Sequence, residues 1–266
     1  MQRTARIALS FDDGRSDNYY AIKKVLIPNA LHSTVYITTG YVDGTCEDEF
    51  RPTPKKAMTV EEVQELSRED LVEIGLHGDK HLNEDWDILE SWNKMLRWLS
   101  KPDTFRFGFA SPSSQFPVNK LENWERGECP LSNYLSHIAV GPRFDHMHAL
   151  RVFARKVSRV IPSGLIYSLA YSDTFLPPGN LVAVYRVPIM AGITAHQVIT
   201  LIRLAVAKRA NLVLMFHSIE RLPDDNWGWS EKKFSQMCSF LKRMQDSQLA
   251  RVVTVSEMLE QLKTDH

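Results

Sequence analysis

The sequence predicts an α/β protein in which a parallel sheet closes into a (β/α) barrel. Short apolar runs rich in β-branched residues alternate along the chain with longer amphipathic stretches, and this alternation is repeated seven or eight times. Regular alternation of strand and helix is typical of a parallel sheet with helices packed on it. A chain of 266 residues is long enough to close such a sheet into a barrel.

The expected strands are short and rich in residues that favour β structure. The runs span residues 6–9, 33–38, 72–76, 104–109, 137–140, 181–187, 212–216 and 251–255.

The stretches between these runs predict helices, because apolar residues recur in them at helical spacing. Thr59-Val-Glu-Glu62 has the form of a capping box and opens a helix that ends at about residue 67. The stretch 116–136 has no clear period and is expected to be an inserted loop. Since no internal repeat, low-complexity segment or Gly/Ser linker interrupts the chain, residues 1–266 are expected to form a single domain. The remaining helices are expected at 19–30, 85–99, 148–160, 195–207 and 231–247.

The composition argues against several classes of partner and location, although a balanced total charge leaves local charged patches possible. Lys plus Arg equals Asp plus Glu at 32 each, so no global field attracts nucleic acid, and none is expected as a partner. The three cysteines form no CxxC pair, which favours a reducing compartment. No run approaches the roughly 20 apolar residues that span a bilayer. The N-terminal residues lack the apolar stretch of a secretory signal, so we expect a cytoplasmic protein without a transmembrane segment.

Polar side chains follow three of the expected strands at the point where each strand ends. The first strand leads into Ser10-Phe-Asp-Asp-Gly14, the third into His77-Gly-Asp-Lys-His81, and the seventh into His217. Parallel barrels keep their active sites at the C-terminal ends of the strands. Two histidines four residues apart lie on one side of a helical turn and can share a metal ion. The sequence therefore indicates a candidate active site at this end of the barrel.

Each of these features also has a plainer explanation when taken alone. Asp12 and Asp13 could be solvated aspartates of a turn, and His77 and His81 could be a chance pair that binds nothing. A histidine such as His217 at a strand end is often a hydrogen-bonded residue of the rim. Three polar features at the same end of one barrel are much less expected by accident than any single one.

Taken together, the three segments resemble the polysaccharide deacetylase family (carbohydrate esterase family 4). Ser10-Phe-Asp-Asp-Gly14 matches four of five positions of the family motif Thr-Phe-Asp-Asp-Gly. His77-Gly-Asp-Lys-His81 keeps both histidines of the motif His-Ser/Thr-x-x-His, and Met215-Phe-His217 matches Leu-x-His with Met in place of Leu. The resemblance runs from about residue 7 to about residue 262. It implies a distorted (β/α) TIM-like barrel with about seven parallel strands.

The resemblance also implies a role for each of the five residues. Asp13, His77 and His81 would bind a divalent metal ion, Asp12 would be the general base and His217 the general acid. A set of two histidines and one carboxylate leaves coordination positions open, as catalytic metal sites do. Zinc is the default ion, and Co²⁺, Ni²⁺, Fe²⁺ or Mn²⁺ would also suit the site.

The third family motif is altered in this sequence. It usually reads Arg-Pro-Pro-Tyr-Gly, and the corresponding stretch here contains Ala110, Pro112 and Ser113. We expect Pro112 and Ser113 to contact the substrate, with the Ser113 N–H as a candidate donor to an oxyanion. The arginine that orients the base in the family is replaced by Ala110. Arg186 follows a later strand and could reach the same space, although it could equally be a surface arginine.

Two further positions bear on the substrate and on the metal site. Trp227 and Trp229 follow His217 closely, and tryptophans commonly stack on sugar rings, so both are candidate substrate-binding residues. Packing in the core is an equally good explanation for them. Gly78 replaces the Ser or Thr that supports the metal ligands in the family, and the fourth motif, Asp-x-x-Asp-Trp, has no clear counterpart.

The favoured function is metal-dependent removal of an acetyl group from an N-acetylated amino sugar. Because no secretory signal is evident, we expect a substrate of cytoplasmic glycan or surface-polysaccharide (lipopolysaccharide) biosynthesis, as a free, nucleotide-linked or lipid-linked sugar. A different amide hydrolase on the same fold, such as a deformylase or a cyclic-amide hydrolase, remains an alternative, as does a catalytically silent sugar-binding module. An iron oxygenase fits the ligand set but usually has an antiparallel scaffold.

Overall fold

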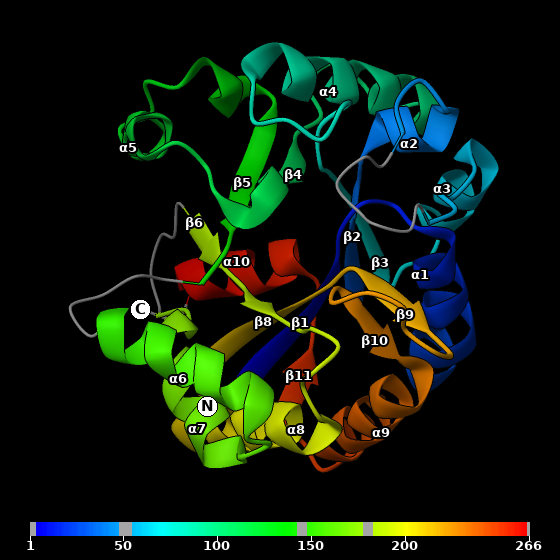
Figure 1. The fold of residues 1–266 in the computed structure, drawn as a ribbon. Helices are drawn as coiled ribbons and strands as arrows, with labels where there is room; N and C mark the ends of the chain where they lie inside the picture. Colours follow the sequence, from blue (N-terminus) through cyan, green and yellow to red (C-terminus); the bar gives the residue numbers. More distant parts are fainter. Residues whose placement is uncertain (1–3, 48–54, 143–147, 178–182, 265–266) are drawn as a thin grey trace.

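The structure, a computed structural model, is built on a sheet of nine strands in which every pairing is parallel (Figure 1). It describes residues 4–47, 55–142, 148–177 and 183–264. The order along the sheet is β6-β5-β4-β3-β2-β1-β8-β7, and β11 pairs with the N-terminal part of β1. The strands are β1 (Ala5–Phe11), β2 (Ser33–Ile37), β3 (Val72–Leu76), β4 (Phe107–Ala110), β5 (Leu135–Val140), β6 (Ala183–Tyr185), β7 (Val187–Pro188), β8 (Asn211–Phe216) and β11 (Ala250–Val252).

The two ends of this order meet at a single residue, Arg186. It separates β6, which pairs with β5, from β7, which pairs with β8. One bent strand therefore bridges the two edges, and the sheet closes into a barrel. If β6 and β7 are counted as one strand, seven strands form the ring, with β11 added outside it. The prediction of a distorted parallel barrel of about seven strands is confirmed.

Helices cover the outer face of the barrel and bury their apolar sides against it (Figure 1). In α4, Ile88, Trp92 and Met95 recur at helical spacing and are buried in this outer core. The helices on or near this layer are α1 (Ser16–Ala21), α2 (Thr39–Asp43), α3 (Val60–Leu66), α4 (Asp85–Leu99), α5 (Val118–Glu125), α6 (His148–Val160), α7 (Gly164–Tyr171), α8 (Ala195–Lys208) and α9 (Glu231–Asp246).

The interior of the barrel is filled by a second set of side chains. This set includes small residues such as Ala8 and Ala139 together with the large Tyr36. Gly75 and Gly108 leave room for the rings of Tyr36 and His137, which are joined by a hydrogen bond of 2.9 Å. The last helix, α10 (Val255–Thr264), packs its apolar side into the N-terminal end of the barrel. That end is therefore closed, and a substrate can reach the strands only from their C-terminal ends.

Several predicted elements agree closely with the observed ones and others differ. The strand 72–76 and the helices 85–99 and 148–160 have the predicted bounds. The stretch 116–136 is not a plain loop, because it contains α5 and the start of β5. Its period escaped detection because α5 is short and exposes Val118, so few apolar residues mark one face.

Other elements were not predicted. These are α2, α7, α10 and the two-stranded sheet of β9 (Ser218–Glu220) and β10 (Gly228–Ser230). The region 19–30 begins as an α-helix but continues as a π-helical turn and a 3-10 turn up to Pro28 and Asn29. Of the predicted strand 181–187, residues 181 and 182 lie outside the described residues. Within the described parts of the chain, no helix combines the length and apolar character needed to cross a membrane.

The close approach of Gly75 to Tyr36 gives a test of the barrel interior. A Cβ at position 75 would lie 2.6 Å from the Tyr36 ring and 2.8 Å from the Gly108 carbonyl oxygen. We expect Gly75→Ala to lower the free energy of unfolding by about 1–3 kcal/mol, as overpacking does. At Gly192 the nearest atom is 3.5 Å away, so Gly192→Ala is the control and should change stability by less than about 1 kcal/mol. Equal effects in urea denaturation would contradict the packing described here.

Candidate active site

The C-terminal ends of the strands surround a cavity of about 380 Å³. Asp12 and Asp13 reach it from the end of β1, His77 and His81 from the segment after β3, and His217 from the end of β8. The three segments that were expected to converge therefore do so, in one cavity at the open end of the barrel.

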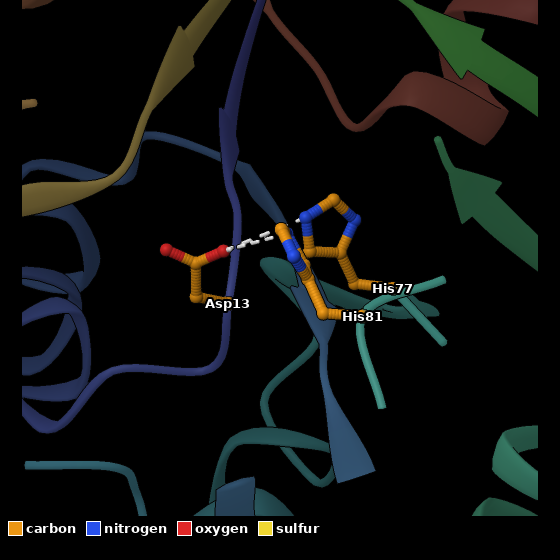
Figure 2. Close-up of side chains that lie close together, drawn as sticks. All are labelled: Asp13, His77 and His81. Carbon is orange, nitrogen blue, oxygen red and sulfur yellow. Dashed lines mark ion pairs between the residues drawn. The ribbon is translucent and has the colours of Figure 1, made fainter. Parts of the chain in front are cut away.

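Asp13, His77 and His81 form a compact cluster in the wall of this cavity (Figure 2). The Asp13 Oδ1 atom lies 3.5 Å from His77 Nε2 and 3.7 Å from His81 Nε2. The two imidazole rings are 4.8 Å apart between centroids. One donor atom from each residue lies within 4.8 Å of the other two.

This donor set fits a metal ion. Ligands that surround zinc tetrahedrally at about 2.0–2.1 Å lie roughly 3.3 Å from one another, close to the two distances found here. The Nδ1 atom of His77 lies 2.7 Å from the Ala110 carbonyl oxygen, to which it can only donate. This bond keeps a proton on Nδ1, so Nε2, which faces Asp13, is the ring atom that would bind a metal ion once it is deprotonated. Asp13, His77 and His81 are therefore the residues that could hold the ion.

The backbone explains how two adjacent aspartates reach the same cavity. Asp13 has a φ of +76°, in the left-handed region, which turns its side chain out of the alternation of β1. Aspartate tolerates this conformation better than most residues. The bends on either side are held by backbone bonds from Thr38 N to the Asp13 carbonyl and from Met58 N to the Gly14 carbonyl. Asn18 also donates to the His217 carbonyl and so ties the ends of β1 and β8 together.

The charges of the cluster shift the pKa values of its members. Burial by itself raises the pKa of Asp13, but the hydrogen bond to His77 and the neighbouring histidines lower it well below its usual value. The other carboxylate oxygen of Asp13 lies 3.4 Å from the buried guanidinium of Arg15. Burial lowers the pKa of His77, and the charges of Asp12 and Asp13 outweigh this and raise it. The pKa of His81 is lowered to about 4, mainly by burial and then by the charge of His77.

Asp12 is held by Arg186 in a two-pronged ion pair. The Nη1 and Nη2 atoms of Arg186 lie 2.6 Å and 3.0 Å from the two carboxylate oxygens, and both side chains are almost fully buried. Burial raises the pKa of Asp12, but Arg186 and then His77 and His217 lower it overall. The carboxylate is thus kept ionised and fixed in orientation. Arg186 is therefore a buried partner of Asp12 and not a surface arginine.

The loop that carries the two histidines is anchored by Asp87, which lies in the first turn of α4. Its carboxylate accepts hydrogen bonds from the backbone N–H groups of Asp79, Lys80 and Leu82, at 3.1, 2.7 and 3.0 Å. Gly78 has a φ of +82°, and a Cβ there would overlap the same carboxylate. Asp87 thus occupies the space that a side chain at position 78 would need, and only glycine fits beside it.

The predicted substrate-binding residues are not all placed on the cavity. Ser113 and Trp227 line it, and the Trp227 ring lies 4.7 Å from the His217 ring between centroids. Trp229 is a core residue, and the prediction that it binds substrate is wrong. It is fully buried, and its Nε1 donates to the Ile193 carbonyl. Pro112 is buried behind the cavity wall, where its carbonyl accepts from Asn83.

Sequence reasoning missed several residues of the site. Asp87 and Asn83 brace the loops of the site, Arg15 faces Asp13, and Arg159 lines the cavity from α6. Of these, only Arg15 carried a local signal, since it directly follows the Asp-Asp-Gly turn. Asn83 and Asp87 follow His81 closely but no motif marks them, and Arg159 comes from a helix distant in the chain.

The fold and the cluster define a parallel (β/α) barrel with an Asp-His-His site at its strand ends. Residues 2–110 match the family model described as Polysaccharide deacetylase. This match includes Asp12, Asp13, His77 and His81, and it confirms the resemblance of the chain to the polysaccharide deacetylase family. No curated protein sequence matches the chain significantly.

Several solved structures are similar to this chain at low sequence identity. A candidate polysaccharide deacetylase from Mycobacterium smegmatis is 12% identical, with a TM-score of 0.50 over 98% of this chain and 91% of that one. A family 4 acetyl xylan esterase from Clostridium thermocellum, in complex with a cobalt ion, is 12% identical, with a TM-score of 0.48 over 96% and 91%. A de-N-acetylase from Aggregatibacter actinomycetemcomitans is 15% identical, with a TM-score of 0.39 over 52% of this chain. This chain covers 63% of that protein, which is less than two thirds.

Asp87 can be tested through stability and hydrogen exchange. We expect Asp87→Ala to lower the free energy of unfolding by about 2–4 kcal/mol, because three backbone N–H groups lose a charged acceptor. Amide exchange at Asp79, Lys80 and Leu82 should accelerate more than elsewhere. Asp103→Ala, at an exposed aspartate, is the control. Unchanged protection of the three amides would contradict the anchoring role.

The lowered pKa of His81 predicts a pH dependence of stability in the metal-free protein. Between pH 6.5 and about 4 the unfolded chain binds a proton at this histidine and the folded chain does not, so stability falls as the pH falls. The loss attributable to His81 reaches about 3 kcal/mol at pH 4. Urea denaturation with a chelator present, compared with His81→Gln, should show a flatter profile for the variant. Parallel profiles would contradict the assignment.

Proposed function

We propose that the protein is a metal-dependent hydrolase that removes the acetyl group from an N-acetylated amino sugar. The observation that carries the proposal is the juxtaposition of a three-donor metal cluster with a second, separately held carboxylate, Asp12, in one cavity. A binding module would need the cluster but not the additional carboxylate. The match of residues 2–110 to the deacetylase family supports the same reaction class.

Asp13, His77 and His81 would hold the ion, with zinc as the default. A divalent ion there supplies Lewis acidity that polarises a carbonyl oxygen and makes water easier to deprotonate. The ionised Asp13 is ready to bind, and the Nε2 of His77 would give up its proton to the solvent when the ion binds, because ligands must be deprotonated. The chain itself must then supply the base, the acid and the fixed position of the substrate.

We assign the role of general base to Asp12. Its lowered pKa keeps it ionised at neutral pH, and Arg186 fixes the direction of its carboxylate. The low pKa makes Asp12 a weak base in the free enzyme, so its role depends on a nucleophile that is already acidified. Asp12 would therefore act as a base only when a metal ion is held by Asp13, His77 and His81.

We assign the role of general acid to His217. It directly follows β8, lines the same cavity and packs against Trp227. In its protonated form it would give a proton to the departing amine nitrogen, which is a poor leaving group without one. Ser113, in the left-handed region with a φ of +56°, lines the same cavity, and its backbone N–H is the proposed oxyanion donor.

The proposed substrate is an amino sugar of cytoplasmic glycan or surface-polysaccharide biosynthesis. Trp227 is half-exposed on the cavity wall, where its flat ring could stack on the C–H face of a sugar. Met190, Met215 and Pro188 provide further apolar wall. A wall of this kind suits a pyranose ring, which has one apolar face and a polar edge.

Two substitutions separate the metal site from the base. We expect Asp12→Asn to lower the rate of acetate release about 10²–10⁴-fold while the metal content stays unchanged. His77→Ala should lose both the metal and the activity. Asp246→Asn, at an exposed aspartate of α9, is the control and should keep both.

The experiment measures acetate and formate release from a panel of N-acylated free, nucleotide-linked and lipid-linked sugars, with and without a chelator. Metal content comes from elemental analysis and folding from circular dichroism. Full turnover in Asp12→Asn would overturn the assignment of the base. Release of formate without acetate would show a deformylase instead.

A further inference from the structure

The helical hairpin of α6 and α7 exposes an unusual amount of apolar surface. Within the described residues twelve large apolar side chains are exposed, and six of them belong to this hairpin, which spans residues 148–171. The hairpin lies at the periphery of the fold, with its two helices side by side (Figure 1). We call these six residues the hairpin patch: Leu150, Phe153, Val160, Ile161, Leu165 and Leu169.

The hairpin is firmly built, so the exposure of the patch is not a consequence of fraying. Arg151 donates to the Leu169 carbonyl at 2.6 Å and Arg155 to the Ala170 carbonyl at 3.1 Å, which fastens α6 along α7. Both arginines also lie within 3.6 Å of the buried carboxylate of Asp173. The Ser163 side chain caps the start of α7. The patch is thus a fixed surface with a defined orientation.

The charge of the hairpin has one sign. Residues 148–172 contain three Arg and one Lys and no Asp or Glu, in a chain whose net charge is zero. Arg151 and Arg155 are used within the hairpin, whereas Lys156 and Arg159 are exposed. Apolar side chains interspersed with exposed cations are typical of helices that lie in a membrane interface.

The patch adjoins the candidate active site. Arg159 lines the cavity that contains Asp12 and the metal cluster, and the next residue, Val160, is the most exposed member of the patch on α6. A surface that contacts the hairpin patch would therefore also lie next to the mouth of the cavity.

We propose that the hairpin patch docks on an anionic lipid bilayer. Phe153, Val160 and Leu165 enter the headgroup region, and Lys156 and Arg159 contact lipid phosphates. The next step rests on the proposed deacetylation. In that case a membrane lipid presents the amino sugar, and Arg159 lies beside the phosphate of this lipid at the cavity mouth. The docking itself does not depend on the reaction.

A second copy of the chain fits this surface less well. A symmetric dimer through the patch would bring Lys156 and Arg159 of each copy toward the same cations of the other, and like charges at an interface cost binding energy. Anionic headgroups complement these cations and accept the apolar side chains at the same time.

The test measures co-sedimentation of the full chain with vesicles of phosphatidylcholine, with or without phosphatidylglycerol. We expect binding to the anionic vesicles and much weaker binding to the neutral ones. The double variant Phe153→Ser/Leu165→Ser should bind at least about tenfold less, since each buried apolar side chain contributes more than 1 kcal/mol. Lys156→Gln should weaken binding about fivefold and only on anionic vesicles.

The matched control is Val118→Ser/Leu222→Ser. These residues are 70% and 83% exposed, against 64% and 79% for Phe153 and Leu165, but lie outside the hairpin. The control should bind vesicles as the wild type does, and both double variants should keep wild-type activity on a water-soluble substrate.

Equal loss of binding in the two double variants, or no binding of the wild type to anionic vesicles, would overturn the proposal. So would a concentration-dependent dimer abolished by Phe153→Ser/Leu165→Ser. Vesicle binding without any deacetylase activity would refute the proposed function and leave the docking intact.

Discussion

The ion pair between Asp12 and Arg186 is the interaction on which the rest of this structure depends. Arg186 is the residue at which the sheet closes, and its side chain extends across the barrel to the end of β1. Removing one partner of such a buried pair costs about 3–5 kcal/mol, because the other charge is left without compensation. The closure of the barrel and the orientation of the candidate base are therefore fixed by the same contact. The guanidinium also lies 5.3 Å from the centre of the Tyr36 ring, which completes its contacts inside the barrel.

Two chemically identical neighbours, Asp12 and Asp13, acquire different tasks from their surroundings. Asp12 continues the strand geometry and faces a permanent cation, while the left-handed conformation of Asp13 turns its carboxylate toward two imidazoles. A non-glycine residue in that conformation is sparsely populated and persists only where the surrounding structure holds it. Both carboxylates can remain ionised side by side because each has its own positive partner. Without Arg186 and the histidines, like charges this close would favour protonation of one of them.

The sequence predicted the features that depend on local pattern and on strand order. The alternation of runs predicted the barrel, and the strand-end positions of Asp12, His77 and His217 predicted a common cavity, because parallel strands share one end. It could not predict that β6 and β7 are one strand bent at Arg186, because local periodicity does not show which strands pair. It could not predict Asp87 as an anchor, because its three bonds go to backbone groups. Trp227 and Trp229 were indistinguishable in sequence, yet they are separated by Gly228 and fall on opposite sides, one on the cavity and one in the core.

The position of the hairpin patch follows from the same barrel geometry. A barrel closed at its N-terminal end by α10 admits substrate only at the strand ends, so whatever surrounds that end decides which molecules approach. A chain of zero net charge has no long-range attraction to a membrane. Its affinity must come from the few cations and apolar side chains of one element, and such contacts give reversible rather than permanent attachment. Reversible attachment would allow the enzyme to leave one lipid-borne sugar and bind the next. It would also bring the cavity to the membrane surface without a transmembrane anchor.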